Sequence, residues 1–164
     1  MNKINFLEKT STIQTRTLFS KDMKMRYLLE MNFNSVGKKA CIIMLYPSAA
    51  DEYIIDQTTQ LVRNNAIEQG FGSISIVNLF CSLDLNHPET DRMNSSVVAQ
   101  ACSDAEVIIV AYGRGIAYTE EKESLLNALK TYKEKLYTIV DITGQPYSHP
   151  LSPKARKWKL KKLN

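Results

Sequence analysis

Apolar runs alternate with amphipathic stretches along most of this chain. The apolar runs predict four strands, over residues 40–45, 73–80, 107–111 and 136–140. Apolar residues at helical spacing predict three helices, over about 56–70, 93–102 and 119–132. Strands separated by helices form right-handed crossovers. We therefore expect an α/β three-layer sandwich, in which helices cover both faces of a mostly parallel sheet of four core strands plus an N-terminal edge strand at 25–33.

The length of 164 residues, 44% of them hydrophobic, suits a single α/β domain over residues 1–164 with one core. Within it, residues 1–24 are expected to form an N-terminal extension and residues 152–164 a basic C-terminal tail. The sequence has neither an apolar leader nor a run of membrane-spanning length, so we expect a soluble cytoplasmic protein without a membrane partner. Three cysteines in apolar or helical contexts, Cys41, Cys81 and Cys102, predict small buried thiols.

The basic character of the chain, with net charge +4, lies in its tail. Six of the 21 cations and none of the acids follow Asp141, so the first 141 residues carry 15 cations against 17 acids. A basic segment with an aromatic residue can bind phosphates and stack on a base. The candidate nucleic-acid contacts are Arg156, Lys157, Trp158 and Lys159. A solvated terminal helix or a frayed tail is the alternative.

Polar, loop-forming residues mark the ends of three predicted strands. They are residues 46–51 after the first core strand, Asn78 near the end of the second, and 144–151 after the last. In an open α/β sheet, ligands bind outside the carboxyl ends of the strands. We therefore expect these residues to converge on one site.

The first of these loops offers small residues and two carboxylates. Pro47 and Ser48 let backbone N–H groups approach a ligand, and Asp51 and Asp56 can activate water or hydrogen-bond a base or sugar. The structural alternative is that Ser48 or Asp51 caps a turn and Asp56 caps the following helix.

Asn78 and His149 carry the side chains best suited to recognition and proton transfer. With a donor and an acceptor, Asn78 suits a flat heterocycle or an amide, although it can equally tie down the neighbouring loop. His149 can exchange a proton with a reacting oxygen, or it is simply a surface histidine. His87 lies in a loop that shows no other sign of chemistry.

No metal and no cofactor is expected. The two histidines are 62 positions apart and the cysteines lack paired ligand spacing. Residues 112–115 read Tyr-Gly-Arg-Gly and lack the third glycine of a dinucleotide fingerprint. Gly113 and Arg114 are candidates for contact with a phosphate or carboxylate, and a glycine turn with an exposed arginine is the alternative.

Four blocks in order resemble the family catalogued as domain of unknown function 1643, from about Arg26 to Leu151. They read Met44-Leu45-Tyr46-Pro47-Ser48-Ala49-Ala50-Asp51 with Asp56-Gln57-Thr58, Val77-Asn78-Leu79-Phe80, Tyr112-Gly113, and Gly144-Gln145-Pro146-Tyr147-Ser148-His149-Pro150-Leu151. The family usually has asparagine where this chain has Tyr46. A tyrosine there supplies a stacking face or a phenolic hydrogen bond. No settled activity comes with the family name.

The same blocks are similar, more distantly, to the uracil-DNA glycosylase superfamily. That resemblance implies Asp51 or Ser48 as the first-loop residue that activates water, Asn78 as the reader of a flipped base, and His149 as the partner of the departing base's oxygen. It also implies a uracil-DNA-glycosylase-like fold.

The residues and the resemblance together favour a glycosylase-like enzyme, or an altered relative, that acts on a nucleobase in a nucleotide or nucleic acid. The base would stack on Tyr46 or Phe80, be read by Asn78, and be released with the help of Asp51 and His149. Two alternatives remain, a non-enzymatic module that binds nucleotide or nucleic acid and a protein-binding adaptor of a mobile element.

Overall fold

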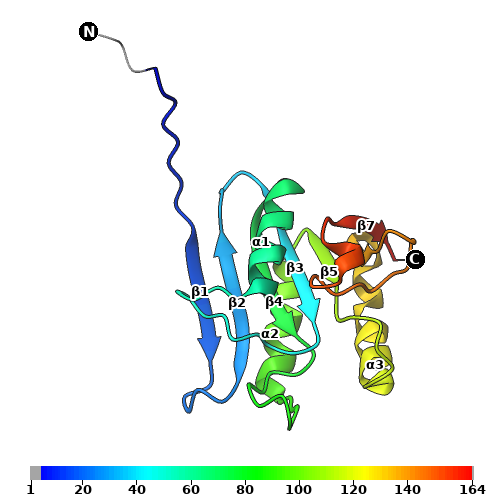
Figure 1. Cartoon of the computed structure of the whole chain (residues 1–164). Coiled ribbons are helices and arrows are strands. Elements are labelled where there is room, and N and C mark those ends of the chain that lie inside the picture. Colours follow the sequence, from blue (N-terminus) through cyan, green and yellow to red (C-terminus); the bar gives the residue numbers. More distant parts are fainter. Residues whose placement is uncertain (1–4, 164) are drawn as a thin grey trace.

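The computed structural model describes residues 5–163. In this part of the chain seven strands form one sheet, and the predicted core strands are its central members (Figure 1). The strands are β1 (Gln14–Phe19), β2 (Arg26–Asn32), β3 (Lys38–Met44), β4 (Phe71–Asn78), β5 (Val107–Val110), β6 (Leu136–Val140) and β7 (Lys159–Lys162). The helices are α1 (Gln57–Glu68), α2 (Arg92–Asp104) and α3 (Thr119–Leu129), with short 3-10 segments η1 (Lys130–Lys135) and η2 (Pro153–Ala155).

The four central strands run parallel to one another, as predicted. The order across the sheet is β1-β2-β4-β3-β5-β6-β7. In the parallel part, Ile42 of β3 lies opposite Ile76 of β4 and Ile109 of β5. The outer strands β1, β2 and β7 each run antiparallel to the strand they join, so the whole sheet is mixed.

The sheet is larger than the sequence predicted, and the prediction of one N-terminal edge strand was wrong. Strand β2, expected at the edge, lies between β1 and β4. The additional strands come from the stretch expected as an extension, which contains β1, and from the basic tail, which contains β7. Both are too polar to stand out as apolar runs in the sequence. They form strands because they pair with a neighbouring strand, and not because their side chains are buried.

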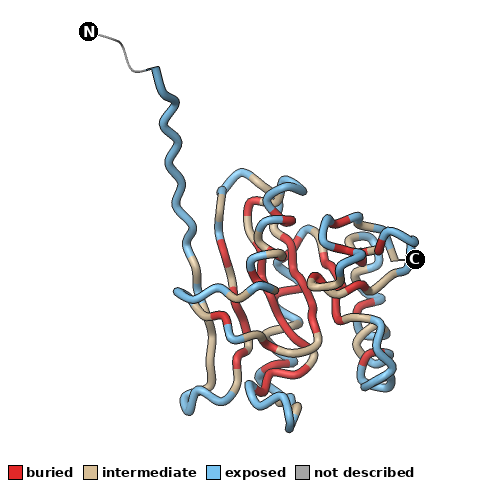
Figure 2. The backbone as a smooth tube through the Cα atoms, viewed as in Figure 1, coloured by how far each residue is buried: buried red, intermediate tan, exposed pale blue. Residues whose placement is uncertain are grey.

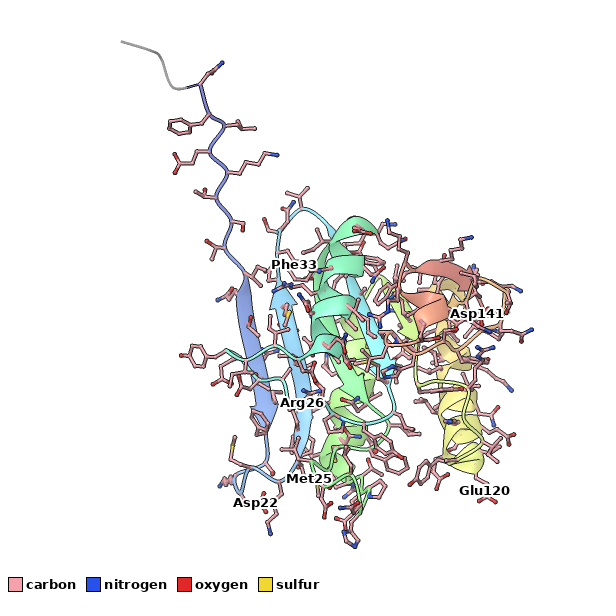
Figure 3. The ribbon with its side chains drawn as sticks, in the orientation of Figure 1. Asp22, Met25, Arg26, Phe33, Glu120 and Asp141 are labelled. Carbon is pink, nitrogen blue, oxygen red and sulfur yellow. The ribbon has the colours of Figure 1, made fainter. Side chains whose placement is uncertain are left out.

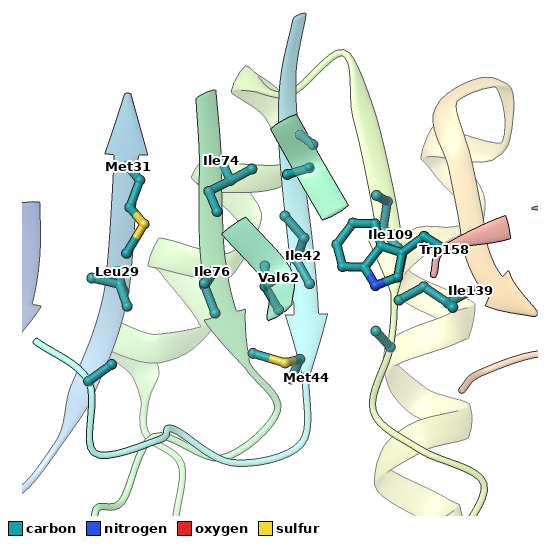
Figure 4. Packing of buried hydrophobic residues seen from close by; sticks show 14 of the residues in the cluster. Leu29, Met31, Ile42, Met44, Val62, Ile74, Ile76, Ile109, Ile139 and Trp158 are labelled. Atoms are coloured by element: carbon teal, nitrogen blue, oxygen red, sulfur yellow. The ribbon is translucent and has the colours of Figure 1, made fainter. Parts of the chain in front are cut away.

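Alternate side chains of the strands enter two hydrophobic clusters, one on each face of the sheet. On one face, Ile42 and Ile76 pack against Val62 of α1 (Figure 4). On the other face, Ile43 packs in a cluster that includes Cys102 of α2 and Leu129 of α3. Helices therefore cover both faces, as predicted. The three cysteines are free and buried, which confirms that expectation.

The helices begin and end close to the predicted positions. Asp56 caps α1 by accepting a 2.8 Å hydrogen bond from the backbone N–H of Thr59, and Asp91 caps α2 in the same way through Asn94. Helix α3 ends at Leu129, earlier than the expected Tyr132, because the chain tightens into η1. Within residues 5–163, none of the helices has both the length and the apolar character needed to cross a membrane.

Two glycines allow the β2–β3 turn to pack against the start of β4. A Cβ atom added to Gly37 would lie 2.3 Å from the backbone nitrogen of Gly72, and one added to Gly72 would lie 2.2 Å from the carbonyl oxygen of Asn34. Any side chain at either position would therefore separate the two backbones.

The C-terminal segment packs against α1 and contributes two buried residues, Ala155 and Trp158, to the domain core. The indole of Trp158 is 4% exposed and packs in the same cluster as Val62 and Ile109 (Figure 4). Asn65 of α1 donates from Nδ2 to the carbonyl oxygen of Arg156, and its Oδ1 accepts from the backbone N–H of Trp158, both at 2.9 Å. These contacts fix the position of the tail.

Candidate functional site

The predicted strand ends meet along one edge of the sheet. Strands β3 and β5 are neighbours at the centre of the sheet. The chain leaves β3 through α1 to β4, on the far side of β3, whereas it leaves β5 through α3 to β6, on the far side of β5. Diverging connections of this kind leave a crevice at the carboxyl ends of the two adjacent strands. The segment 144–151 also reaches this edge, since the Cβ of His149 lies 3.7 Å from the point a Cβ on Gly113 would occupy.

A buried arginine braces the first loop. Arg26, at the start of β2, is 1% exposed and lies toward this edge of the sheet (Figure 3). Its Nη1 donates to the carbonyl oxygens of Ala50 at 2.8 Å and Ser48 at 3.0 Å, and its Nη2 donates to Oδ1 of Asn78 at 3.4 Å. Burial lowers the pKa of Arg26 to about 10, against the opposing effect of Asp56, so the side chain remains a cation at neutral pH. One cation thus holds together the loop after β3 and the end of β4.

The amide of Asn78 is engaged in the same network. Its Nδ2 donates to the carbonyl oxygen of Tyr46 at 2.6 Å, while its Oδ1 accepts from Arg26. Asn94 of α2 donates from Nδ2 to the backbone oxygens of Asn78 at 3.1 Å and Leu79 at 3.3 Å. In this structure Asn78 ties down the neighbouring loop, which is the structural alternative that the sequence left open.

The polar side chains of the first loop also have structural partners. Oδ1 of Asp51 accepts from the backbone N–H groups of Ile54 at 2.7 Å and Tyr53 at 2.8 Å, and these bonds lower its pKa. Asp56 caps α1, and Oγ of Ser48 lies 3.3 Å from Oγ1 of Thr59. The carboxylate of Asp51 is therefore ionised at neutral pH and is a weak base.

Three aromatic rings gather at this edge and form what we call the aromatic cluster: Tyr46, Phe80 and Tyr118. The rings of Tyr46 and Phe80 stack with their centroids 5.8 Å apart. Tyr118 lies edge-on to Tyr46 at 6.1 Å and to Phe80 at 4.7 Å, in a left-handed backbone conformation with φ of 60°. The pKa of Tyr46 is raised to about 12, mainly by burial and secondly by the hydrogen bond with the Tyr118 hydroxyl, so the phenol is neutral.

A groove of about 610 Å³ runs from Phe80 between α2 and α3. Its walls are mostly apolar and include Ile43, Val98, Leu125 and Leu129. Hydrogen-bond acceptors line it as well, because Glu120 and Glu121 lie at the start of α3 (Figure 3 labels Glu120) and Asn94 lies on α2. Within the described residues, the buried Oδ1 of Asn94 has no hydrogen-bond partner.

His149 has one ring nitrogen engaged in its own loop. Its Nδ1 accepts a 3.1 Å hydrogen bond from the backbone N–H of Leu151, so the proton of the neutral ring resides on Nε2. Burial lowers the pKa of His149 below its ordinary value of 6.5, which keeps the ring neutral at pH 7. A neutral imidazole can donate from Nε2 to a carbonyl oxygen or an oxyanion.

A second hollow of about 300 Å³ lies beside the first turn of α3 and is lined by two cations, Arg114 and Lys122, and one carboxylate, Glu123. Nη2 of Arg114 donates to Oδ2 of Asp141 at 2.8 Å. Hydrogen bonding to Thr143 is the main reason that the pKa of Asp141 falls to about 2. Nζ of Lys122, a buried side chain, donates to the carbonyl oxygen of Gly115 at 2.7 Å, and burial lowers its pKa. Cations placed in this way suit an anionic ligand.

A comparison with family models decides the relationship of the chain. The model described as "Protein of unknown function (DUF1643)" matches residues 26–151, which include all four sequence blocks. The chain belongs to the DUF1643 family. No curated protein and no solved structure matches it. The expected family resemblance is confirmed, while the similarity to uracil-DNA glycosylases rests on the order of the blocks alone.

The DUF1643 match ends before the basic tail, and the structure changes how that tail is understood. Trp158 was expected to stack on a base, but its ring is buried in the core and is not available. Arg156, Lys157 and Lys159 are exposed, so their charges can still meet phosphates. The cause of the difference is the docking of the tail on Asn65, which no sequence pattern indicated.

Three residues of this DUF1643 site were missed in the sequence: Arg26, Tyr118 and Lys122. A charged residue at the start of an apolar strand was a usable signal for Arg26, because a buried guanidinium needs several acceptors nearby. Tyr118 gave no signal in its loop. Lys122 resembled any lysine on a solvated helix face.

Proposed function

We propose that the carboxyl edge of this DUF1643 domain binds the base of a nucleotide. The observation that carries the proposal is the continuity between the aromatic cluster and the groove, since Phe80 belongs to both. Stacked rings beside an apolar groove favour a flat heterocycle, because such a ligand gains contact area with little loss of flexibility.

The polar lining of the groove favours a base that bears an amino group. Glu120, Glu121 and Asn94 all present acceptors, and the Oδ1 of Asn94 lacks a donor within the described residues. Adenine, cytosine and guanine carry exocyclic N–H₂ donors, whereas uracil does not. We therefore rank the amino-bearing bases above uracil as ligands.

The hollow beside α3 is the proposed site for the phosphate of the same nucleotide. It is lined by Arg114 and Lys122, and the first turn of α3 separates it from the acceptors of the groove. Base and phosphate would then lie on opposite sides of that turn. The hollow is also lined by one carboxylate, Glu123, but its two cations outnumber it, whereas the groove is lined by two carboxylates, Glu120 and Glu121, and, in the described part of the chain, by no cation.

Binding is better supported than bond cleavage. Asp51 is held in a turn with a lowered pKa, and Asp56 caps a helix, so neither carboxylate is poised as a base. Tyr46 stands where the family usually has asparagine and is a neutral phenol. A recognition module therefore fits these groups better than a hydrolase.

Calorimetric titration of the full chain with the four nucleoside monophosphates tests the proposal. We expect the amino-bearing nucleotides to bind more tightly than UMP. Tyr46→Ser should weaken their binding by about 5- to 160-fold, since stacking of one base contributes roughly 1–3 kcal/mol. Tyr53→Ser is the matched control, because Tyr53 is an exposed tyrosine outside the aromatic cluster. The proposal fails if none of the four nucleotides binds, or if Tyr46→Ser binds as the wild type does.

The exposed cations of the tail extend the proposal to nucleic acid. The tail packs against α1, on the face of the sheet opposite the groove, so a longer ligand whose terminal base occupies the groove would pass round the carboxyl edge to meet Arg156, Lys157 and Lys159. Arg156→Ala together with Lys157→Ala should then weaken binding of a short single-stranded oligonucleotide, reduce its salt dependence, and leave binding of a mononucleotide unchanged. Equal effects on both ligands would contradict a role in backbone contact.

Cleavage of an N-glycosidic bond is a second candidate, favoured by the neutral imidazole of His149. In such a reaction water adds to the anomeric carbon, the C–N bond breaks, and the departing base takes up the proton that the water loses, while Nε2–H would stabilise the oxygen of that base. Asp51 is the first-loop carboxylate that the resemblance to uracil-DNA glycosylases implies for orienting that water. Chromatography would detect free base released from a nucleotide, with His149→Gln inactive and His87→Gln, at the exposed histidine, fully active. Absence of free base in the wild type removes this candidate and leaves the binding proposal standing.

A further inference from the structure

The two edges of the sheet differ in how they are protected. Strand β7 carries Lys159, Lys161 and Lys162, and exposed lysines on an edge strand discourage pairing with another chain. Strand β1 carries Thr15 and Thr17, which favour strands, and its one charged residue, Arg16, already forms an ion pair with Glu30 at 3.5 Å. In the described sheet, β1 is hydrogen-bonded on one side to β2 and is open on the other.

An exposed arm continues β1 away from the domain (Figures 1 and 2). Residues 5–13 are all exposed, and the side chains of Phe6 and Leu7 are 74% and 81% accessible. On an extended segment these two side chains point to opposite faces, so pairing with another strand would let each of them reach apolar groups on its own side. The arm and β1 together form a run long enough to pair with a second extended segment.

We propose that two copies of this chain pair through β1, the arm of each lying antiparallel along β1 of the other. The proposal does not depend on the function of the carboxyl edge. The two-fold axis passes at Thr12, so that any two opposed residues have numbers that add to 24. Phe6 then lies opposite the partner's Leu18, and Glu8 opposite the partner's Arg16. Each of these contacts occurs twice by symmetry.

Charge complementarity selects this register. With the axis at Thr12, the carboxylate of Glu8 meets a guanidinium, whereas the neighbouring two-fold registers, which are shifted by two residues, place Phe6 or Thr10 opposite that same Arg16. Opposite charges directly across an antiparallel pair stabilise it, and like charges destabilise it. Residues 6, 8, 16 and 18 all have even numbers, so their side chains lie on one face of the paired strands. Contact of Phe6 with the partner's Leu18 therefore adds apolar burial on the same face as the charge pair.

The opposite face of β1 offers a second charge pair. Oγ1 of Thr17 donates to Oε2 of Glu52 at 3.4 Å, so the loop after β3 lies over this face of β1. In the proposed register Lys9 is the diagonal neighbour of the partner's Thr17 and therefore lies near the partner's Glu52. The same loop exposes Tyr53 and Ile54, at 88% and 66%, which a neighbouring arm would cover.

Light scattering of the full chain tests the pairing. We expect a species of twice the chain mass of 18.6 kDa. Glu8→Arg alone and Arg16→Glu alone should each weaken self-association by about tenfold, because each places like charges opposite each other twice. Mixed together, these two variants should form a heterodimer, since every opposed pair then carries opposite charges. A monomer at all concentrations, or a dimer indifferent to both substitutions, overturns the proposal.

Cysteine cross-linking tests the register without perturbing charge. Thr12→Cys places two thiols directly opposite each other, at a Cα separation of roughly 5 Å that a disulfide spans. Thr10→Cys is the matched control, because it lies opposite the partner's Gln14 and about 14 Å from its own copy. The natural cysteines are buried. We expect rapid covalent dimer formation for Thr12→Cys only, and equal rates for both variants would refute this register.

Discussion

Nη1 of Arg26 donates a 2.8 Å hydrogen bond to the carbonyl oxygen of Ala50, and this bond joins β2 to the loop after β3. The acceptor belongs to a loop without helix or strand, so its backbone oxygens have no ladder to satisfy them. A single buried guanidinium therefore defines the shape of the loop that carries Tyr46 and Asp51.

Replacing Arg26 by methionine should destabilise the protein by about 3 kcal/mol, because several buried acceptors lose their donor at once. Urea unfolding followed by circular dichroism measures the change. Glu134→Gln is the control, because its exposed ion pair with Lys162 contributes at most about 1 kcal/mol. A loss for Arg26→Met no larger than that of Glu134→Gln would show that other contacts hold the loop.

Trp158→Ala should destabilise the protein by about 4 kcal/mol, since it leaves a large cavity beneath α1. Trp158→Phe should lose less, because most of the apolar contact remains. The exposed neighbour Lys157 provides the control, and Lys157→Ala should be neutral. Trp158 is the only tryptophan of the chain, so its fluorescence reports directly on this cluster. Red-shifted native emission would show that the ring is exposed after all.

The parallel centre of the sheet was predictable because β3, β4, β5 and β6 are apolar on both faces and separated by helical periodicity. The outer strands were not, since the side chains of β1 and β7 are polar and their assignment depends on which neighbour they pair with. Burial of Trp158 could not be predicted from the sequence either, because a basic segment at a chain end resembles a solvated tail.

The location of the candidate site was predictable from where apolar runs stop, whereas the roles of its side chains were not. Asn78 and Asp51 appear in sequence as free polar groups, yet each is engaged by partners distant in sequence or by backbone N–H groups. Such partners are fixed only by the three-dimensional arrangement. Tyr118 joins the aromatic cluster through a left-handed backbone conformation that its residue type does not favour.

The role of Asp56 can be separated into capping and ligand contact. Asp56→Ala should destabilise the protein by about 1 kcal/mol, because the N–H of Thr59 loses its acceptor, whereas Asp56→Ser should retain the cap. Thermal unfolding measures both. If Asp56 is a cap alone, Asp56→Ser also binds nucleotide as the wild type does. Normal stability with lost binding in Asp56→Ser would instead assign Asp56 a direct contact with the ligand.

His149 should make the stability of the protein fall as the pH is lowered. Its folded pKa lies below the ordinary value of 6.5 because burial disfavours the charged ring. Between these two values the unfolded chain binds a proton that the folded chain does not, so the free energy of unfolding decreases as pH drops through this window and is constant above it. His149→Gln should remove that decrease. Urea unfolding at pH values above and below 6.5 checks it, with His87→Gln as the control.

Asp84 raises the pKa of His87, so the contribution of His87 to stability has the opposite sign, present at low pH and lost as pH rises. His87→Gln should therefore steepen the loss of stability on acidification, and a pH dependence of His149→Gln as steep as that of the wild type would contradict a buried, neutral His149.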